Sequence, residues 1–211
     1  FEYESKKSGS ITISHLRISD TPIKSTYTLT NADFIAIHNY SFVGRYDVLK
    51  GLNAGCVVLL NTVLDQNGLS EDLPDYFVKA LKETEAKFYV LNAQKIAKDC
   101  GLGNKINVIM QAAFFKLANI MDYSKAVEAM KLAVKKTYGK KGDKVVESNY
   151  NAIDSALSGL VEIDVNALKG KHYGERKETD YYNNFIKPIN ELKGNDLKVS
   201  AFNPRGFVPT G

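Results

Sequence analysis

The sequence contains little cysteine, no tryptophan and no long hydrophobic run. Its 2 cysteines, Cys56 and Cys100, lie far apart and lack Cys-x-x-Cys spacing, which predicts neither a disulfide framework nor a zinc or iron–sulfur site. We therefore expect a protein of a reducing compartment with no metal of its own. Every apolar run is shorter than the roughly 18 residues that a membrane-spanning helix needs, and no signal-peptide pattern opens the sequence, so no membrane partner is expected.

The net charge of the chain is also small. The formal net charge is +4, and the basic residues occur in short pairs instead of the long stripe, interleaved with aromatic residues, that is typical of nucleic-acid binding. No nucleic-acid partner is therefore expected. The sequence leaves open whether three of these pairs are phosphate contacts or solvated helix ends: Lys6-Lys7, Lys135-Lys136 and Lys140-Lys141.

The length allows one main domain with an appendage. A chain of 211 residues can bury a sizeable core, and its composition changes after Val161, where residues 164–180 are polar and typical of a linker. We predict a domain over residues 1–161, followed by a linker and a further segment over residues 162–211. Because the sequence begins at Phe1 without an initiator methionine, we also expect a piece of a longer polypeptide, truncated at its N-terminus.

Hydrophobic runs alternate with helical patterns through the first half of the chain. Continuous apolar runs predict buried strands, and a His or Asn stands at the end of each: His38, Asn61 and Asn92. We expect strands over residues 32–38, 55–61 and 88–93 and helices over residues 42–49 and 74–87. This order predicts the α/β class, with a layered, mostly parallel sheet flanked by helices and ligand binding at the carboxyl ends of the strands.

The second half of the chain has a helical pattern. The most apolar segment, over residues 104–120, is apolar on most of its circumference, which predicts burial on several sides. The expected helices cover residues 96–100, 104–120, 124–138 and 144–160, with a short helix from Tyr181 and an extended end over residues 197–202. The chain should therefore finish in a helical and extended tail behind the α/β domain.

A glycine bend at residues 101–103 precedes the most apolar helix. Its glycines favour positive φ, and the free amides and positive dipole end of the following helix would lie just beyond. Two interpretations stay open: an anion or polar cofactor edge binds there, or the glycines only end one helix before the next begins. Asn107 and Gln111 share one helix face. Their amides either contact a ligand or form hydrogen bonds in the core. Asn149 and Asn151 lie inside a helical pattern, where Asn is unfavourable by about half a kcal/mol, so we expect a compensating contact.

Charged residues also accompany a strand expected over residues 11–16. Lys7 lies at the rim of this strand, where a lysine can reach a phosphate as a point charge. His15 and Arg17 share the apolar face of the same strand. They bind an anion or another domain, or they form a structural hydrogen-bonded pair, and the sequence does not decide between these interpretations.

Several motifs follow one another in a specific order: Ser5-Lys6-Lys7-Ser8-Gly9, Ser14-His15-Leu16-Arg17, Pro22-Ile23-Lys24-Ser25-Thr26-Tyr27, Gly101-Leu102-Gly103-Asn104-Lys105-Ile106-Asn107, residues 111–116, and Tyr138-Gly139-Lys140-Lys141-Gly142. Together they resemble pyruvate:ferredoxin (flavodoxin) oxidoreductase, and specifically its gamma-type domain, the third in the single-chain enzyme. The resemblance covers residues 3–161. Residues 181–211 are similar to the segment that leads into the next domain.

The resemblance implies an oxidoreductase that acts on a 2-oxo acid with an iron–sulfur protein as electron acceptor. In this family pyruvate is oxidatively decarboxylated to acetyl-CoA and CO2 on thiamine diphosphate and Mg, and electrons leave through iron–sulfur clusters to ferredoxin or flavodoxin. These cofactors would lie elsewhere in the full enzyme, because two cysteines are too few for a cluster, which needs about four. The implied partners are other domains of the same polypeptide and a second copy in a homodimer. The implied location is the cytoplasm, or an anaerobic organelle such as a hydrogenosome.

The same resemblance implies that this chain takes part in binding coenzyme A. The contacts that carry over by motif are Lys7, Asn107 and Asn149, and no catalytic or metal-binding residue carries over. Two positions depart from the family pattern, since Lys105 replaces an Arg and Ser10 replaces a Gly, and the glycine-rich phosphate loop that precedes this region in the family is absent. The alternatives are a structural module that holds neighbouring domains together and, ranked last, an independent dinucleotide-binding domain.

Overall fold

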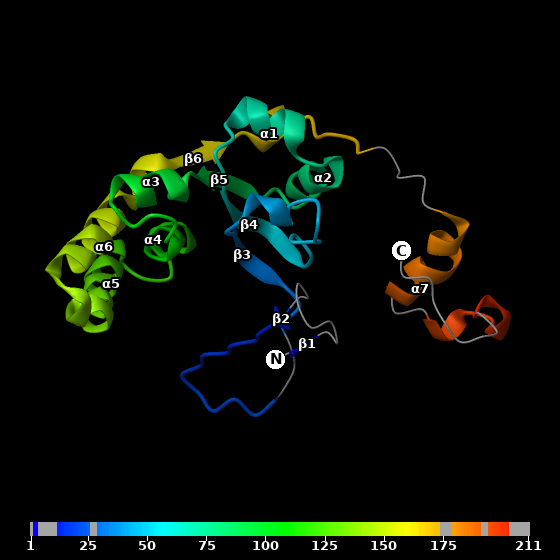
Figure 1. Cartoon of the computed structure of the whole chain (residues 1–211), viewed down its shortest axis with the longest axis horizontal. Helices are drawn as coiled ribbons and strands as arrows, with labels where there is room; N and C mark the ends of the chain where they lie inside the picture. Colours follow the sequence, from blue (N-terminus) through cyan, green and yellow to red (C-terminus); the bar gives the residue numbers. More distant parts are fainter. Residues whose placement is uncertain (1, 4–11, 26–28, 174–178, 191–193, 203–211) are drawn as a thin grey trace. The chain divides into compact units, whose positions relative to one another are not determined.

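The computed structural model describes residues 2–3, 12–25, 29–173, 179–190 and 194–202. The chain divides into two compact units, Phe1–Lys171 and His172–Gly211. The first unit contains the sheet and six of the labelled helices, and the second contains short helical turns (Figure 1). The functional division of the chain into residues 1–161 and 162–211 stays a prediction.

The first unit is built on a four-stranded sheet. Its strands are β3 (Ala32–Ile37), β4 (Leu52–Asn61), β5 (Lys87–Leu91) and β6 (Leu160–Ile163), in the spatial order β3-β4-β5-β6. The first three strands are parallel, and β6 runs antiparallel to β5. A separate antiparallel pair joins β1 (Glu2–Tyr3) to β2 (Thr12–Ile13). The predicted α/β class with a mostly parallel sheet is therefore confirmed.

Helices follow the strands, and one of them, α1, was not expected from the sequence pattern. In the first unit they are α1 (Gln66–Asp72), α2 (Asp75–Glu83), α3 (Ala93–Asp99), α4 (Asn107–Ala118), α5 (Tyr123–Tyr138) and α6 (Asp143–Ser155). In the second unit a π-helical turn, Tyr182–Ile186, continues into α7 (Lys187–Asn190). Among the residues described, no helix is long and apolar enough to cross a bilayer.

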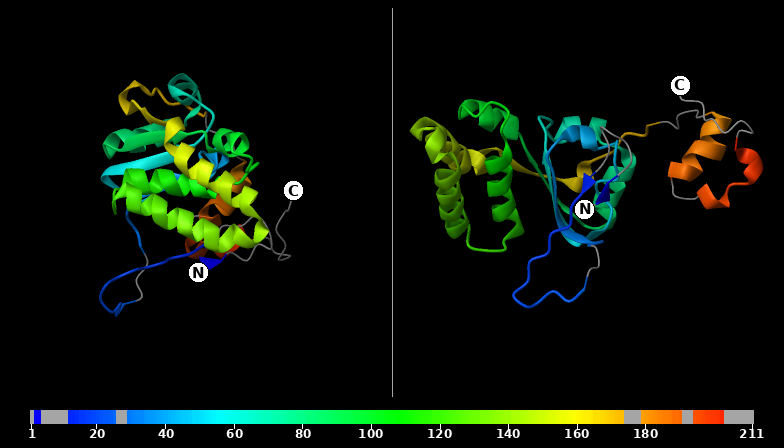
Figure 2. Two further views of the ribbon diagram at one scale, coloured as in Figure 1. Left: turned by 90° about the vertical axis from the view of Figure 1, so that its left-hand side faces the viewer. Right: turned by 60° about the horizontal axis from the view of Figure 1, so that its bottom comes forward.

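Both faces of the sheet are covered, because successive side chains of a strand point to opposite sides. Val58 and Leu60 of β4 belong to a buried cluster with residues of α1 and α2, such as Phe77. Leu59, between them, belongs to a second cluster with α3, α4, α5 and α6. Figure 2 shows α1 and α2 on one side of the sheet and the α4–α6 layer on the other. A strand buried on both faces explains the continuous apolar run in the sequence.

Helix α4 lies in the middle of the second layer. Ile109, Met110, Ala112 and Ala113 are buried, and α4 contacts β3, β4, α3, α5 and α6. The Phe114 ring packs edge-on against a ring of β3, with the two centroids 5.0 Å apart. The predicted burial of this helix on several sides is therefore confirmed.

Some predicted elements are wrong. Residues 42–49 were expected to be a helix, but only a 3-10 turn, Tyr40–Phe42, forms there, and Gly44 follows with φ of 85°. The helix expected over residues 144–160 ends at Ser155. Leu160, the last residue of the expected helix, instead begins β6, which pairs with β5. Within the described residues, the strand expected over residues 11–16 is limited to β2, and the expected extended end contains a 3-10 turn, Val199–Ala201. Pairing and packing with distant residues decided these short segments.

The first part of the expected linker packs on the first unit. The Gln66 amide donates to the Asp164 carbonyl at 3.0 Å and accepts from the Asp164 N–H at 2.9 Å, as a neighbouring backbone would. Lys82 Nζ donates to the Leu168 carbonyl at 2.7 Å, and Leu168 is buried. Residues 164–171 are therefore held in place by side chains of α1 and α2.

The polar residues at the carboxyl ends of the strands have structural roles. Asn61 is buried, its Nδ2 donates to the His38 carbonyl at 2.9 Å, and its Oδ1 accepts from the Ala93 N–H at 3.0 Å. Asn92 accepts from the Lys95 N–H at 3.0 Å and so caps α3. The expectation that these amides mark a ligand site is not supported, because both are used in hydrogen bonds within the protein.

We predict that Asn61→Leu strongly destabilises the first unit. The substitution removes the partner of the buried Ala93 N–H and of the His38 carbonyl, whose bond is part-buried, which should lower the free energy of unfolding by about 2–4 kcal/mol. Urea denaturation followed by far-UV circular dichroism measures this. Asn92→Ala, which removes an accessible helix cap, is the control and should cost about 1 kcal/mol. Equal losses in the two variants would contradict the assigned role of Asn61.

Candidate functional site

A hollow of about 110 Å³ lies where the start of α4 meets the end of α5 and the first half of α6. Two of the three predicted contacts, Asn107 and Asn149, line it together. The third, Lys7, lies outside the described residues. The residues that line the hollow are Leu102, Lys105, Asn107, Val108, Tyr138, Lys141, Val145 and Asn149.

Asn149 is the buried amide of the hollow. Its side chain belongs to a residue only 7% exposed, and its Nδ2 donates to the Val145 carbonyl one turn earlier, at 2.7 Å. This bond is the compensating contact that was expected for one of the two helical asparagines, whereas Asn151 is exposed. Among the residues that the structure describes, none donates a hydrogen bond to Asn149 Oδ1. That oxygen is therefore available to a donor in the hollow.

Asn107 brings the amino end of α4 to the hollow. It is the first residue of the helix, and Ile106 before it supplies no side-chain cap, so the N–H groups of the first turn keep their donor capacity. Asn107 itself is exposed. Gln111, one turn further, is also exposed and does not line the hollow. The expected buried pair is therefore wrong, because α4 turns its intervening apolar residues toward the core.

The glycine bend ends α3. The Gly101 N–H donates to the Lys98 carbonyl at 3.0 Å and the Leu102 N–H to the Ala97 carbonyl at 2.7 Å, the pair of bonds of a Schellman motif. Gly101 has φ of 76° and Gly103 has φ of 63°, conformations that favour glycine. The helix-ending interpretation is thus confirmed. The same bend also carries Leu102 to the wall of the hollow.

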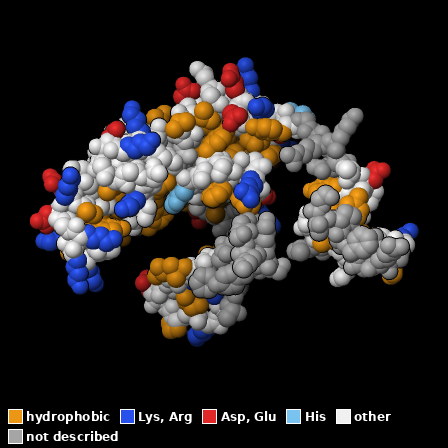
Figure 3. All heavy atoms as spheres, viewed as in Figure 1, with side chains coloured by type: hydrophobic (Ala, Val, Ile, Leu, Met, Phe, Trp, Pro, Cys, Tyr) orange, Lys and Arg blue, Asp and Glu red, His pale blue; other side chains and the backbone are white. Residues whose placement is uncertain are grey.

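Two lysines make the hollow electropositive. Lys105 and Lys141 both line it, and Lys141 Nζ lies 5.5 Å from the centroid of the Tyr138 ring, which also lines it. Residues 123–144 contain seven lysines against two acidic residues, and one of these lysines, Lys131, forms an ion pair with Asp154 at 2.6 Å. Figure 3 shows several Lys and Arg side chains on the part of the surface formed by α5 and α6. A cluster of one sign raises the local concentration of anions.

Tyr138 and Val145 were not expected from the sequence to belong to a site, whereas Lys141 was left open between a phosphate contact and a solvated helix end. A signal was present, since the Tyr138-Gly139-Lys140-Lys141-Gly142 turn was noted as basic and as a family motif. What the sequence could not provide was the packing of α6 on α4, which brings this turn beside Asn107.

The two cysteines lie away from the hollow's lining. Cys56 is buried in β4, and burial raises the pKa of its thiol, so it stays protonated near neutral pH. Cys100 ends α3 and is partly exposed. Across the described part of the chain, no group of three or more His, Cys, Asp and Glu side chains could hold a metal ion. The polar groups that line the hollow include the amides of Asn107 and Asn149 and the ammonium groups of Lys105 and Lys141.

Comparisons with known proteins point to one family. Residues 1–159 match the family described as pyruvate ferredoxin/flavodoxin oxidoreductase. A pyruvate:ferredoxin oxidoreductase of Moorella thermoacetica is 44% identical over 216 residues, covering 100% of this chain and 18% of that protein. A pyruvate dehydrogenase [NADP(+)] of Cryptosporidium parvum is 37% identical over 246 residues, covering 100% of this chain and 13% of that protein.

The chain thus spans less than a fifth of the length of these relatives. Among solved structures, the pyruvate oxidoreductase subunit PORC of Thermotoga maritima matches with a TM-score of 0.49 and 20% identity, covering 64% of this chain and 67% of that one.

We predict that Gly101→Ala and Gly139→Ala have opposite effects on stability. Gly101 has positive φ, so a Cβ there should cost about 1–2 kcal/mol even though its nearest neighbour would be Ser148 Oγ at 3.6 Å. Gly139 has helical φ of −54° and open space around it, so alanine should be neutral or stabilising by up to about 1 kcal/mol. Thermal unfolding of the two variants compares them. Destabilisation of both to the same extent would refute the assignment of Gly101 as the cap.

Proposed function

Because this chain belongs to the pyruvate ferredoxin/flavodoxin oxidoreductase family, we propose that it contributes part of the coenzyme A site of the full-length enzyme. The observation that supports this most is the shared hollow, which Asn107 and Asn149 line together with Lys105 and Lys141. Coenzyme A carries several phosphate charges and an arm with two amide groups. Ammonium groups suit the phosphates, and carboxamides suit the arm or the base.

The size of the hollow limits what this chain can bind by itself. Sites for drug-sized ligands usually measure roughly 300–1,000 Å³, whereas this hollow measures about 110 Å³. It is large enough for one polar group of coenzyme A and too small for the whole molecule. We therefore propose a partial site, which Lys7 and other parts of the full-length polypeptide complete.

We propose that the electron acceptor is chosen outside this chain. The two relatives named above match the whole chain at 44% and 37% identity, yet their names specify ferredoxin in one case and NADP(+) in the other. A segment that is similar in enzymes with different electron acceptors fits a reaction step that both enzymes carry out better than the step in which they differ. Coenzyme A binding is such a step in the proposed reaction.

For the full-length enzyme we propose the oxidative decarboxylation of pyruvate to acetyl-CoA and CO2, with ferredoxin or flavodoxin as partner and a homodimer as assembly. Thiamine diphosphate with Mg and iron–sulfur clusters would supply the carbon–carbon cleavage and the electron transfer in other domains. The proposed compartment is the cytoplasm or an anaerobic organelle such as a hydrogenosome. Within this chain the residues bind and orient, and the proposal gives none of them a proton-transfer step.

One observation favours a second candidate, a structural module between domains. The Nδ2 of Asn149 already donates to the Val145 carbonyl, and α4 is packed on several sides, so both could serve packing alone. The two candidates differ in what the exposed Asn107 does. If Asn107 has a structural role, replacing it should lower the melting temperature. If it contacts the ligand, replacing it should weaken the affinity for coenzyme A.

We predict that Asn107→Ala weakens coenzyme A binding and leaves stability nearly unchanged. Losing one hydrogen bond to the ligand should cost about 1 kcal/mol, or roughly fivefold in Kd, measured by calorimetry on the full-length enzyme. Gln111→Ala, an exposed amide one turn away on the same helix, is the matched control and should change neither quantity. A lower melting temperature with unchanged affinity would instead support the structural module.

Lys141→Ala should weaken coenzyme A and leave pyruvate binding unchanged, since its ammonium group lines the hollow and pairs with phosphate. We expect a loss of about 1 kcal/mol that shrinks as salt is added, because screening weakens a partly exposed charge contact. Lys140→Ala is the control, since Lys140 adjoins Lys141 but does not line the hollow. Equal losses in both variants would mean that only the general basic field matters, and no loss in either would remove Lys141 from the site.

A further inference from the structure

A short segment of the first unit exposes several large aliphatic side chains close together. We name residues 14–25 together with Leu29 the aliphatic arm. Leu16 is 78% exposed and Ile18 is 88% exposed, and Ile23 and Leu29 are about half exposed. Single exposed aliphatic residues are normal on protein surfaces, whereas exposed aliphatic residues gathered in one patch are typical of interaction sites.

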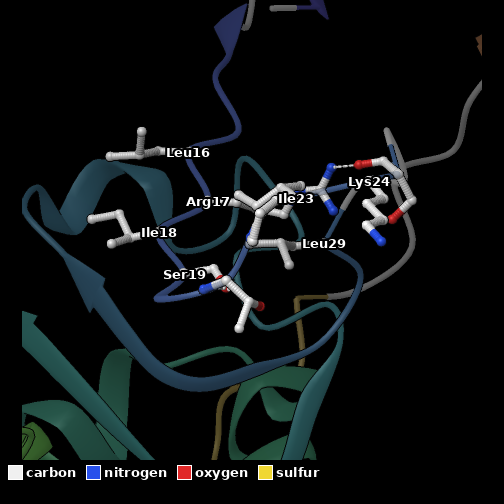
Figure 4. A pocket seen from close by; sticks show the side chains of 10 residues that line it. Leu16, Arg17, Ile18, Ser19, Ile23, Lys24 and Leu29 are labelled. Carbon is white, nitrogen blue, oxygen red and sulfur yellow. Dashed lines mark hydrogen bonds between the residues drawn. The ribbon is translucent and has the colours of Figure 1, made fainter.

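The arm is held in a defined shape by its own hydrogen bonds. The Arg17 guanidinium donates to the Ser25 carbonyl and so joins the two extended stretches. Between them, the Thr21 N–H donates to Ser19 Oγ at 3.1 Å, which forms a turn just before Pro22. Figure 4 shows Leu16 and Ile18 extending to the same side, as residues two apart in an extended segment do. These two bonds constrain the backbone of the arm, which lowers the backbone entropy that is lost on binding.

The arm encloses a hollow that has no opposite wall. This hollow measures about 550 Å³, and the described residues that line it all belong to the arm itself. Ligand pockets of this size usually lie between elements that enclose most of the ligand's surface. A hollow built by one segment leaves its open side to be covered from outside. A protein surface can cover that side and the aliphatic side chains at once.

We propose that the aliphatic arm docks onto another part of the same full-length polypeptide. This chain spans 18% of a relative that matches it over its whole length, and we take the rest of a polypeptide of that kind as the source of the occupant. A covalently linked domain is present at a high effective concentration and needs no separate encounter. The surface it offers should be apolar at its centre, with carbonyl or carboxylate groups opposite the basic Arg17 and Lys24 at the rim. This inference rests on the family assignment and is independent of coenzyme A binding.

The first test is hydrogen exchange in the full-length enzyme, comparing the wild type with the Leu16→Ser/Ile18→Ser double variant. Both side chains are exposed within this chain, so its own core loses little. If the arm is docked, the wild-type amides of residues 14–25 are protected, and the double variant speeds their exchange at least about tenfold without changing α4–α6. Leu132→Ser, a 70% exposed leucine on α5, is the control and should leave the arm unchanged. Unprotected arm amides in the wild type, or no effect of the double variant, would overturn the proposal.

The second test identifies the occupant and remains informative if the double variant fails to fold. A photo-crosslinking amino acid is placed by Ile18→p-benzoylphenylalanine in the full-length enzyme, prepared as a mixture of 14N- and 15N-labelled subunits. The proposal predicts crosslinked peptide pairs of one isotope only, joining the arm to a segment outside these 211 residues. Pairs of mixed isotope would show a second copy in the contact, and no crosslink to protein would show an open surface. Either result overturns the proposal.

Discussion

The close packing of α4 against α6 is the constraint on which the candidate site depends. Ala113 of α4 and Ala152 of α6 are fully buried in one cluster with Ile153, and small side chains let two helices approach closely. This approach brings the amino end of α4 beside Asn149. Leu59 and the other residues on that face of the sheet support the pair from beneath. The hollow is therefore a product of core packing, since no loop has to close over the sheet to form it.

Much of the fold could be predicted because its main strands are long and apolar. The strand ending at Ile37 and the central strand β4 are continuous hydrophobic runs, and the structure confirms both. The missed elements are short and depend on residues far away in sequence. β6 has four residues and gains its hydrogen bonds only from β5, and α1 has seven residues with Leu69 as its buried anchor. No periodicity within such a segment reveals the partner that stabilises it.

The candidate site was predictable in part, for a similar reason. Asn149 was conspicuous because an amide inside a helix needs compensation, and the structure supplies it through Val145. Gln111 was expected to form a buried pair with Asn107, as a ligand contact or a core clamp, because a spacing of four places both on one face. That spacing does not tell which direction the face points, and here it points to solvent beyond the hollow. Lys141 was left open between a phosphate contact and a solvated helix end, because only the packing of α6 on α4 places it in the lining of the hollow.

The central claim is that the start of α4 and the α5–α6 turn together hold part of coenzyme A. Hydrogen exchange of the full-length enzyme, measured with and without saturating coenzyme A, tests it most directly. The account predicts slower exchange on ligand addition in two separated stretches, residues 103–110 and residues 138–149, with α1 and α2 unchanged as an internal reference. Unchanged exchange in both stretches while the enzyme is saturated with coenzyme A would contradict it.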